Sequence, residues 1–270
     1  MTMHVAHQYD GIEHQFAAGK LGMWVLIVTE MLFFSGVFVA YAVCRAARPE
    51  VFSYAHYFLD PKLGALNTCA LLVSSLTAAS AVTAARRNQR RLLCASIALT
   101  IACGALFLGV KYLEYSHKVS HGLLPGARFN PTEQVWELET FQHRHPEAAR
   151  YVETLKARAL DPRAHTGDEA RPEQIEPLLA AGVIGEQAEY PDFPSLPKNA
   201  HMFFGIYFLM TGLHGLHVVG GMGVWVWLLV RAGAGSFGPS YFGPIDYAAL
   251  YWHLVDLIWI YLFPLLYLLN

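Results

Sequence analysis

The chain has 270 residues, of which 54% are hydrophobic and 15% are charged, and its mean hydropathy is +0.31. This composition fits a protein that crosses a membrane several times better than it fits a soluble domain. The 19 basic and 21 acidic residues give a formal net charge of −2, which predicts no affinity for nucleic acid, because nucleic acid attracts clustered positive charge.

Three apolar segments in the first half of the chain are long enough to cross a membrane. Residues 21–43 contain one charged residue, Glu30, while residues 63–85 and 92–110 contain none. A helix needs about 20 predominantly apolar residues to cross the hydrocarbon of a bilayer. We therefore predict three membrane-spanning helices in residues 1–116, the first of three regions that differ in composition.

The connection between the second and third of these segments contains four arginines, Arg86, Arg87, Arg90 and Arg91. Basic residues concentrate in short loops on the cytoplasmic side of membrane proteins. If each predicted span crosses the membrane once, the N-terminus lies on the cytoplasmic side and the C-terminus at Asn270 lies on the outer side.

Residues 117–198 form the second region. They contain 13 acidic and 9 basic residues and no apolar run long enough to cross a membrane. Pro131 and Pro172 each precede acidic residues, a pattern typical of helix starts. We expect an external, partly helical insertion, which either covers exposed loops or provides a docking surface for a partner. The sequence does not favour one of these over the other.

Residues 199–270 form the third region and contain two more spans. The first, residues 199–230, has no Asp, Glu, Lys or Arg in 32 residues but includes His214 and His217; the second, residues 247–269, has one charged residue. Imidazoles inside a span must face protein, because lipid cannot satisfy their nitrogens. The sequence thus predicts an all-α bundle of five transmembrane helices, with a long extramembrane segment between the third and the fourth.

Glu30 is the one charged residue of the first span. It lies about ten residues into that span, which places it roughly 15 Å deep, near the bilayer centre. An ionised carboxylate costs several kcal/mol there, so the group must be protonated, paired or hydrated. We interpret Glu30 as a residue of function or assembly. The alternative is a neutral glutamic acid that makes one structural hydrogen bond between helices.

His214 and His217 are three residues apart, and they share a helix face with Tyr207 and Thr211. Histidine is a common metal and haem ligand, but two axial ligands must reach opposite sides of one haem and normally come from different helices. We therefore favour hydrogen bonds between helices over ligation for these two histidines.

Two further polar positions lie in or near spans. His253 and Asp256 are three residues apart in the last span, which puts a carboxylate within reach of an imidazole. Glu114 stands three residues after Lys111, near the end of the third span, where an ion pair is the simplest interpretation.

Cysteine spacing indicates no cofactor site. Cys44, Cys69, Cys94 and Cys103 form none of the paired motifs that bind zinc, an iron–sulfur cluster or a c-type haem. We therefore expect this chain to attach no c-type haem and to hold no thiolate-rich copper site.

Four segments taken together resemble subunit III of the haem-copper oxidases, and of cytochrome c oxidase in particular. They are KLGMWVLIVTEMLFFSGVF, GVKYLEY, FFGIYFLMTGLHGLHVVGG and YWHLVDLIWIYLFPLLY, and they cover all five predicted spans in order. The resemblance implies a seven-helix pattern of which this chain keeps the last five, as in short bacterial members. The lipid-holding cleft of the longer members would then be completed by another subunit or be missing.

The resemblance also implies roles for residues. Glu30 matches the buried carboxylate of the family that reacts with carbodiimides, so we assign it to subunit contact or to proton-related hydrogen bonding. A second group matches polar positions between helices or shares a face with them, and we predict that it forms one network that orders the bundle and its bound phospholipid: Glu114, Tyr207, Thr211, His214, His217, His253 and Asp256.

By the same resemblance, the chain would support a complex in a bacterial inner membrane that oxidises ferrocytochrome c, reduces oxygen and pumps protons. The chain itself would stabilise subunit I and support proton uptake, but it would bind no metal or redox cofactor and perform no catalysis. Haems and copper would lie in partner subunits I and II, the C-terminus would be periplasmic, and residues 117–198 would meet cytochrome c or another respiratory complex. Two alternatives stay open. One is the same fold in a quinol oxidase or beside a nitric oxide reductase; the other is a small proton-coupled carrier that uses Glu30 and Asp256, although we find no convincing inverted repeat.

Overall fold

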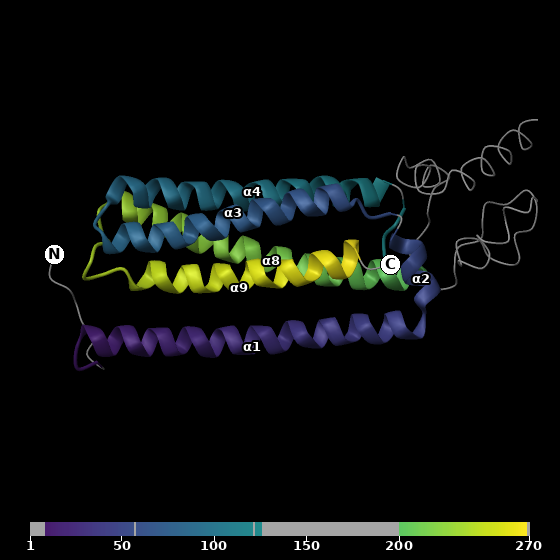
Figure 1. Cartoon of the computed structure of the whole chain (residues 1–270), viewed down its shortest axis with the longest axis horizontal. Coiled ribbons are helices and arrows are strands. Elements are labelled where there is room, and N and C mark those ends of the chain that lie inside the picture. Colours follow the sequence, from purple (N-terminus) through teal and green to yellow (C-terminus); the bar gives the residue numbers. More distant parts are fainter. Residues whose placement is uncertain (1–8, 57, 121, 126–199, 269–270) are drawn as a thin grey trace, which may run out of the picture. The chain divides into compact units, whose positions relative to one another are not determined.

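The computed structural model describes residues 9–56, 58–120, 122–125 and 200–268 (Figure 1). Within these ranges it contains five long helices and one short one. The bounds are α1 Ile12–Ala47, α2 Pro49–His56, α3 Pro61–Arg86, α4 Arg90–Ser120, α8 Ala200–Gly233 and α9 Gly243–Tyr267.

The predicted fold class is confirmed, because all five long helices are long and apolar enough to cross a membrane. Two details differ from the sequence-based prediction. α4 continues to Ser120, so the first residues of the predicted insertion belong to a helix, and α2 lies in a connection where no helix was expected. The rest of the insertion, residues 126–198, falls outside the described residues, so the division into three regions stays a prediction.

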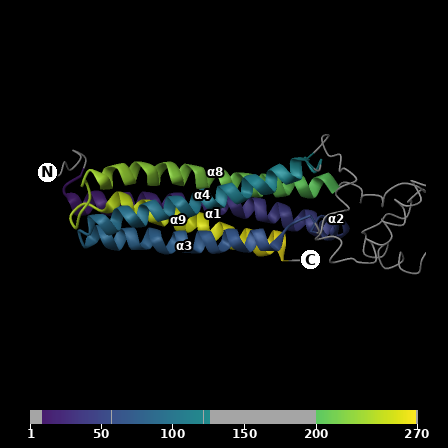
Figure 2. The same cartoon turned by 90° about the horizontal axis from the view of Figure 1, so that it is seen from above.

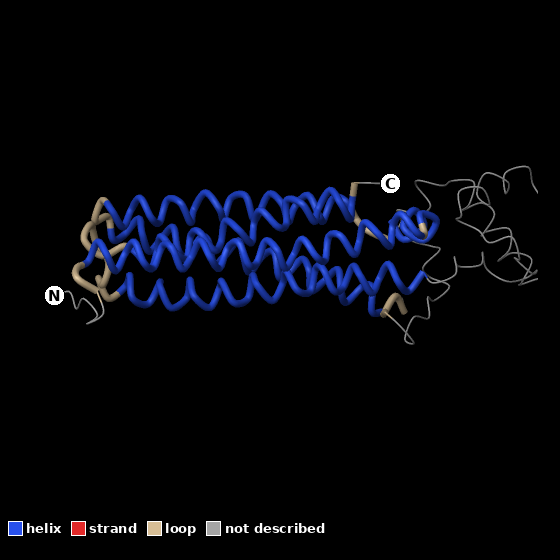
Figure 3. The backbone as a smooth tube through the Cα atoms, turned by 90° about the horizontal axis from the view of Figure 1, so that it is seen from below, coloured by secondary structure: helices blue, strands red, loops and turns tan. Residues whose placement is uncertain are grey.

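Three long helices end in the same pattern of hydrogen bonds. After α3, Asn88 adopts a φ of 56°, and its N–H and that of the next residue donate to the carbonyl oxygens of Ala85 and Ala84. α4 and α8 end in the same way at Gly122 and Gly235, with φ values of 71° and 75°. A left-handed residue at this position satisfies carbonyl groups that the helix leaves free. The chain therefore turns sharply at these three points. Figure 3 draws the described loops and turns in tan.

α3 begins with a capped turn. Asp60 precedes Pro61, and its carboxylate accepts a hydrogen bond of 2.8 Å from the backbone N–H of Lys62. Proline suits the first position of a helix because the N–H that it lacks would have no partner there. Pro49 is likewise the first residue of α2. A proline disfavours helical backbone at the residue before it, so Pro49 separates α2 from α1.

The described helices belong to two compact units, whose segments can be followed by residue number in Figures 1 and 2. The first unit comprises Met1–Val39, Leu63–Tyr112 and Met210–Phe263. The second comprises Ala40–Lys62, Leu113–Leu209 and Pro264–Asn270. Each unit has its own buried residues, and each is described separately below.

Trp252 of α9 is a central core residue of the first unit. Its ring is fully buried, and its indole N–H donates to Ser74 Oγ of α3 over 2.9 Å. A β-carbon on Gly221 of α8 would lie 2.8 Å from this ring, and one on Gly104 of α4 would lie 3.2 Å from it. Position 221 therefore needs glycine, because a side chain would occupy the space of the indole, while at Gly104 the neighbouring side chains would have to move by a few tenths of an ångström.

α1 contacts the rest of the first unit through few side chains. Ile27 and Phe34, seven residues apart, are buried, and the Tyr247 hydroxyl donates to the Phe16 carbonyl oxygen over 2.9 Å. The large hydrophobic side chains that α1 leaves exposed in this unit are Leu21, Trp24, Val25, Leu26, Val28, Met31, Leu32, Phe33 and Val39. In a membrane such a surface faces lipid tails or another protein.

Aromatic side chains fill the core of the second unit. Phe203 of α8 contacts the rings of Phe52 and Tyr207, and Tyr41 of α1 lies edge-on to Phe52 at 5.1 Å between ring centroids. The Tyr41 hydroxyl donates to the carbonyl oxygen of Leu265 over 2.8 Å. These contacts connect parts of α1, α2, α8 and α9 within this unit.

Candidate functional site

A carboxyl group and an imidazole meet in the first unit. Glu30 Oε2 of α1 lies 3.1 Å from Nε2 of His217 on α8. The other ring nitrogen of His217, Nδ1, lies 2.8 Å from the carbonyl oxygen of Leu213, one helical turn earlier. The ring of Phe34 packs edge-on against the imidazole at 5.2 Å between centroids. The imidazole is therefore held on two sides and directed at Glu30.

These contacts fix how many protons the pair contains. A carbonyl oxygen only accepts hydrogen bonds, so Nδ1 of His217 must bear a hydrogen. Nε2 then either accepts from a protonated Glu30 or donates to its carboxylate. In both cases one proton lies between Oε2 and Nε2, and the pair is electrically neutral. Neutrality is the least costly arrangement for two titratable groups inside hydrocarbon.

The residues that the structure describes leave this pair partly exposed. The side chain of Glu30 is 25% exposed and that of His217 is 19% exposed. Both lie within helices that are long and apolar enough to span a membrane. Lipid tails offer no hydrogen bonds to polar atoms, so such a position favours a covering group other than lipid tails.

A second polar group links α3 and α9 in the first unit. Ser75 Oγ lies 2.6 Å from Nδ1 of His253. Ser75 also lies beside the buried carboxyl group of Asp256, but it forms no hydrogen bond of good geometry with either of its oxygens. The imidazole of His253 thus bonds to a neighbouring helix rather than to the carboxyl group three residues along its own.

His214 has a different environment from His217. It is fully buried, its ring lies 5.4 Å from that of Phe107 and 5.3 Å from that of Trp259, and the Lys111 ammonium lies 4.6 Å from the centroid of Trp259. The sequence predicts hydrogen bonds between helices for both histidines. The structure shows one for His217 and, among the described residues, none for His214, which packs as an aromatic ring.

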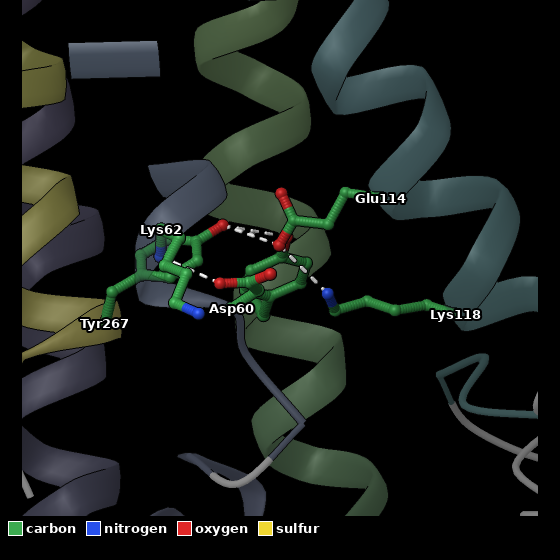
Figure 4. A network of polar contacts seen from close by, with 6 residues as sticks. Asp60, Lys62, Glu114, Lys118 and Tyr267 are labelled. Atoms are coloured by element: carbon green, nitrogen blue, oxygen red, sulfur yellow. Dashed lines mark hydrogen bonds and ion pairs between the residues drawn. The ribbon is translucent and has the colours of Figure 1, made fainter. Parts of the chain in front are cut away.

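Glu114 is the hub of a buried polar cluster in the second unit (Figure 4). Its Oε1 accepts hydrogen bonds from the Lys118 ammonium over 2.9 Å and from the hydroxyls of Tyr207 and Tyr267 over 2.7 Å each. All four residues are buried. Three donors on one carboxylate oxygen repay much of the cost of burying the charge.

The rest of this cluster surrounds the cation. The Lys118 ammonium lies 4.9 Å from the centroid of the Tyr207 ring, and Asp60, which caps α3, is close enough to act on it electrostatically. Figure 4 shows Lys118 and Glu114 extending from α4, with Tyr267 reaching them from α9. The cluster joins α4, α8 and α9 within the second unit and is well suited to fix their ends.

The site residues predicted from the sequence have different hydrogen-bond partners and do not all contact one another among the described residues. Glu114 bonds to Tyr207, and His217 bonds to Glu30, while Thr211 is buried in the first unit. That all of these residues form one network stays a prediction. The partners that sequence analysis missed are Ser75, Lys118 and Tyr267. Lys118 was detectable in principle, because a lysine four residues after a glutamate shares its helix face.

Among the described residues, no three His, Cys, Asp or Glu side chains gather closely enough to hold a metal ion. The expectation that this chain binds no cofactor concerns the whole chain and stays a prediction.

Comparison with known proteins identifies relatives. The family described as cytochrome c oxidase subunit III matches residues 179–270, which include α8 and α9. A protein of Mycobacterium tuberculosis strain H37Rv, named probable cytochrome c oxidase subunit 3, is 37% identical over 92 residues, or 33% of this chain and 44% of that protein. The chain thus aligns with less than half the length of this relative.

Two other relatives align with nearly the whole chain. A Nocardia farcinica protein, also named probable cytochrome c oxidase subunit 3, is 23% identical over 248 residues, which cover 92% of this chain and 86% of that protein. A Staphylococcus haemolyticus protein named probable quinol oxidase subunit 3 is 20% identical over 267 residues, which cover 99% and 96% of the two chains. Together with the match over α8 and α9, these alignments show that the chain is similar to proteins named subunit 3 of cytochrome c oxidase and of quinol oxidase.

Proposed function

We propose that the chain is the non-redox subunit III of a proton-pumping cytochrome c oxidase in a bacterial inner membrane. It stabilises subunit I and supports proton uptake during aerobic electron transport. Its N-terminus is cytoplasmic and its C-terminus periplasmic. The observation that supports this most directly is the Glu30–His217 pair, an interhelix hydrogen bond that the described residues leave partly exposed.

Contact with another subunit follows from the position of this pair. Neutralisation within the pair lowers the cost of placing it in a membrane, but the exposed polar edges still lose hydrogen bonds against lipid tails. A neighbouring subunit with polar groups, or water held at a subunit interface, removes that cost. The exposed apolar side chains of α1 supply the surrounding surface that such a neighbour would cover.

A proton-related role follows from the single shared proton. Moving it between Oε2 of Glu30 and Nε2 of His217 changes the charge on each residue but not the charge of the pair. The two forms therefore differ little in the cost of burial and can exchange in response to a nearby charge. Such a pair can change the local electrostatics at the entrance of a proton path while its net charge stays the same.

The proposal extends to partners and cofactors, on the strength of the resemblance to subunit III. Haems and copper lie in subunits I and II, this chain binds none of them, and phospholipid covers part of its surface. Residues 117–198 contact cytochrome c or another respiratory complex. A second candidate is subunit III of a quinol oxidase, which is supported by the Staphylococcus haemolyticus relative that aligns with 99% of this chain.

The role of Glu30 is tested by replacing it with glutamine in the assembled complex. The carboxamide of E30Q keeps the shape and can still donate to Nε2 of His217, but it cannot ionise. We expect the complex to assemble and to lose oxygen consumption faster during continuous turnover than the unmodified complex. E13Q is the matched control, because Glu13 is an exposed glutamate in the first turn of the same helix. Equal decay in both variants and the unmodified complex would remove the role of Glu30.

A further inference from the structure

The turn between α3 and α4 forms an open depression at one end of the first unit. Its volume is about 450 Å³, and it is lined by Gln89, Arg90, Arg91 and Leu92. The left-handed backbone at Asn88 and the hydrogen bonds that end α3 fix the course of the turn. The backbone of the turn thus places two arginines, Arg90 and Arg91, at the start of α4.

Other basic residues near this turn already have partners. Arg86 and Lys20 both pair with Asp246, at 3.4 Å and 3.8 Å, and Arg86 also lies over the ring of Phe242. Arg231 lies over the rings of three aromatic side chains, Trp227, Phe237 and Tyr241. The positive charges of these residues are therefore at least partly compensated within the unit.

Three arginines of the turn differ from these. Arg87, Arg90 and Arg91 form no ion pair with any acidic residue in the ranges that the structure describes. All three are exposed. Three uncompensated guanidinium groups within five residues attract anions, and a guanidinium group binds the oxygens of a phosphate in a bidentate manner.

An apolar track leads away from the depression along α4. Leu92 lines the depression and is 51% exposed, and Leu99 and Leu106 follow at intervals of seven residues, 48% and 49% exposed. Side chains seven residues apart lie on one face of a helix. The charged end and the leucine track thus match the two parts of a phospholipid, an anionic headgroup and an acyl chain.

We propose that the α3–α4 turn is a binding site for an anionic phospholipid. Arg90 and Arg91 hold the phosphate, Arg87 adds long-range attraction, and one acyl chain follows Leu92, Leu99 and Leu106. Basic groups at the ends of membrane helices attract anionic headgroups in this way. This site rests on the lipid binding that is part of the proposed function, and it specifies where the lipid binds and which class of lipid it is. Its test needs no oxidase activity, so either proposal can fail without the other.

The experiment measures lipid binding by the full chain, purified with its partners in mild detergent, using native mass spectrometry. The probes are phosphatidylglycerol, phosphatidylcholine with the same acyl chains, and inorganic phosphate. We expect phosphatidylglycerol to bind about 25-fold more tightly than phosphatidylcholine, and the loss of each of the two phosphate-binding arginines to weaken this preference roughly fivefold. The variants are R91Q and R90Q/R91Q, and K62Q is the control, because Lys62 is an exposed cation at the start of α3.

Each outcome decides the proposal. Loss of the preference in R91Q and R90Q/R91Q but not in K62Q supports the site, and partial retention in R90K/R91K supports phosphate recognition by guanidinium groups. If R90Q/R91Q does not insert, R91Q and R90K/R91K give the same answer. The proposal fails if the unmodified chain does not distinguish the two lipids, or if K62Q and R91Q change binding equally. It also fails if inorganic phosphate displaces phosphatidylglycerol at equal concentration, because the acyl chain would then contribute nothing.

Discussion

Glu30 Oε2 and His217 Nε2 lie 3.1 Å apart and share a single proton, because the other ring nitrogen of His217 donates to the carbonyl oxygen of Leu213. The two residues are 187 positions apart in the chain. They connect α1, which is otherwise sparsely packed in the first unit, to α8. The pair therefore has both a structural and an electrostatic consequence, and the two can be measured separately.

The structural consequence is a coupling energy between Glu30 and His217. In a double-mutant cycle with E30A and H217A, each of which removes the hydrogen bond, we expect a coupling of about 0.5–3 kcal/mol, the range for residues in direct contact. The measurement is denaturation of the protein in mild detergent. A cycle that pairs E13A with H217A serves as the control and should give no coupling. Additive effects in the first cycle would show that the hydrogen bond contributes nothing to stability.

Close packing at Gly221 predicts a second effect. A β-carbon at this position would lie 2.8 Å from the ring of Trp252, so G221A must displace a fully buried indole. Overpacking of this kind costs about 1–3 kcal/mol. Gly223 is the matched control, because it lies two residues along the same helix and nothing is within 4 Å of its β-carbon position. Thermal unfolding in detergent should therefore shift downward for G221A and not for G223A.

Burial of the Glu114–Lys118 pair predicts strong asymmetry between single and double substitutions. Removing only the carboxylate, in E114A, leaves the Lys118 ammonium buried without the carboxylate to which it is hydrogen-bonded, which costs about 3–5 kcal/mol. Replacing both residues, in E114L/K118M, should recover most of that loss, because no buried charge remains. Chemical denaturation of the three proteins gives the comparison. A double variant that is no more stable than E114A would contradict a paired, buried charge.

The backbone conformation of Asn88 predicts that alanine and glycine at this position affect stability differently. Its φ of 56° is tolerated by asparagine and favoured by glycine, whereas alanine has no side-chain hydrogen bond to offset the strain. We expect N88A to lower stability by about 1 kcal/mol and N88G to leave it unchanged or raise it slightly. Thermal unfolding of the two variants side by side tests this. Equal effects would mean that the turn does not depend on its backbone conformation.

The sequence was informative wherever one segment determines its own structure. The five spans follow from long apolar runs, and Glu30 stands out because a charge inside such a run is costly. The ends of the helices were harder to predict, because α4 continues through charged residues to Ser120. Lys118 was consequently assigned to an external segment, although it is buried beside Glu114.

Partners across the chain were not predictable from local patterns. Tyr267 donates to Glu114 from 153 residues away, and Ser75 meets His253 from 178 residues away. Spacing within one helix places His253 and Asp256 on one face, but it does not determine which of them meets a hydroxyl on the next helix. The same spacing grouped His214 with His217, while the surrounding helices give the two rings different environments.

The most direct test of the proposed function is purification of this chain by an affinity tag from its native membrane in mild detergent. The measurements are the reduced-minus-oxidised visible spectrum of the preparation and its oxygen consumption. A cytochrome c oxidase subunit should co-purify with a-type haem and with oxygen consumption driven by reduced cytochrome c. A b-type haem with quinol-driven oxygen consumption would select the second candidate. A preparation without any haem protein, under conditions that preserve complexes, would contradict an oxidase subunit.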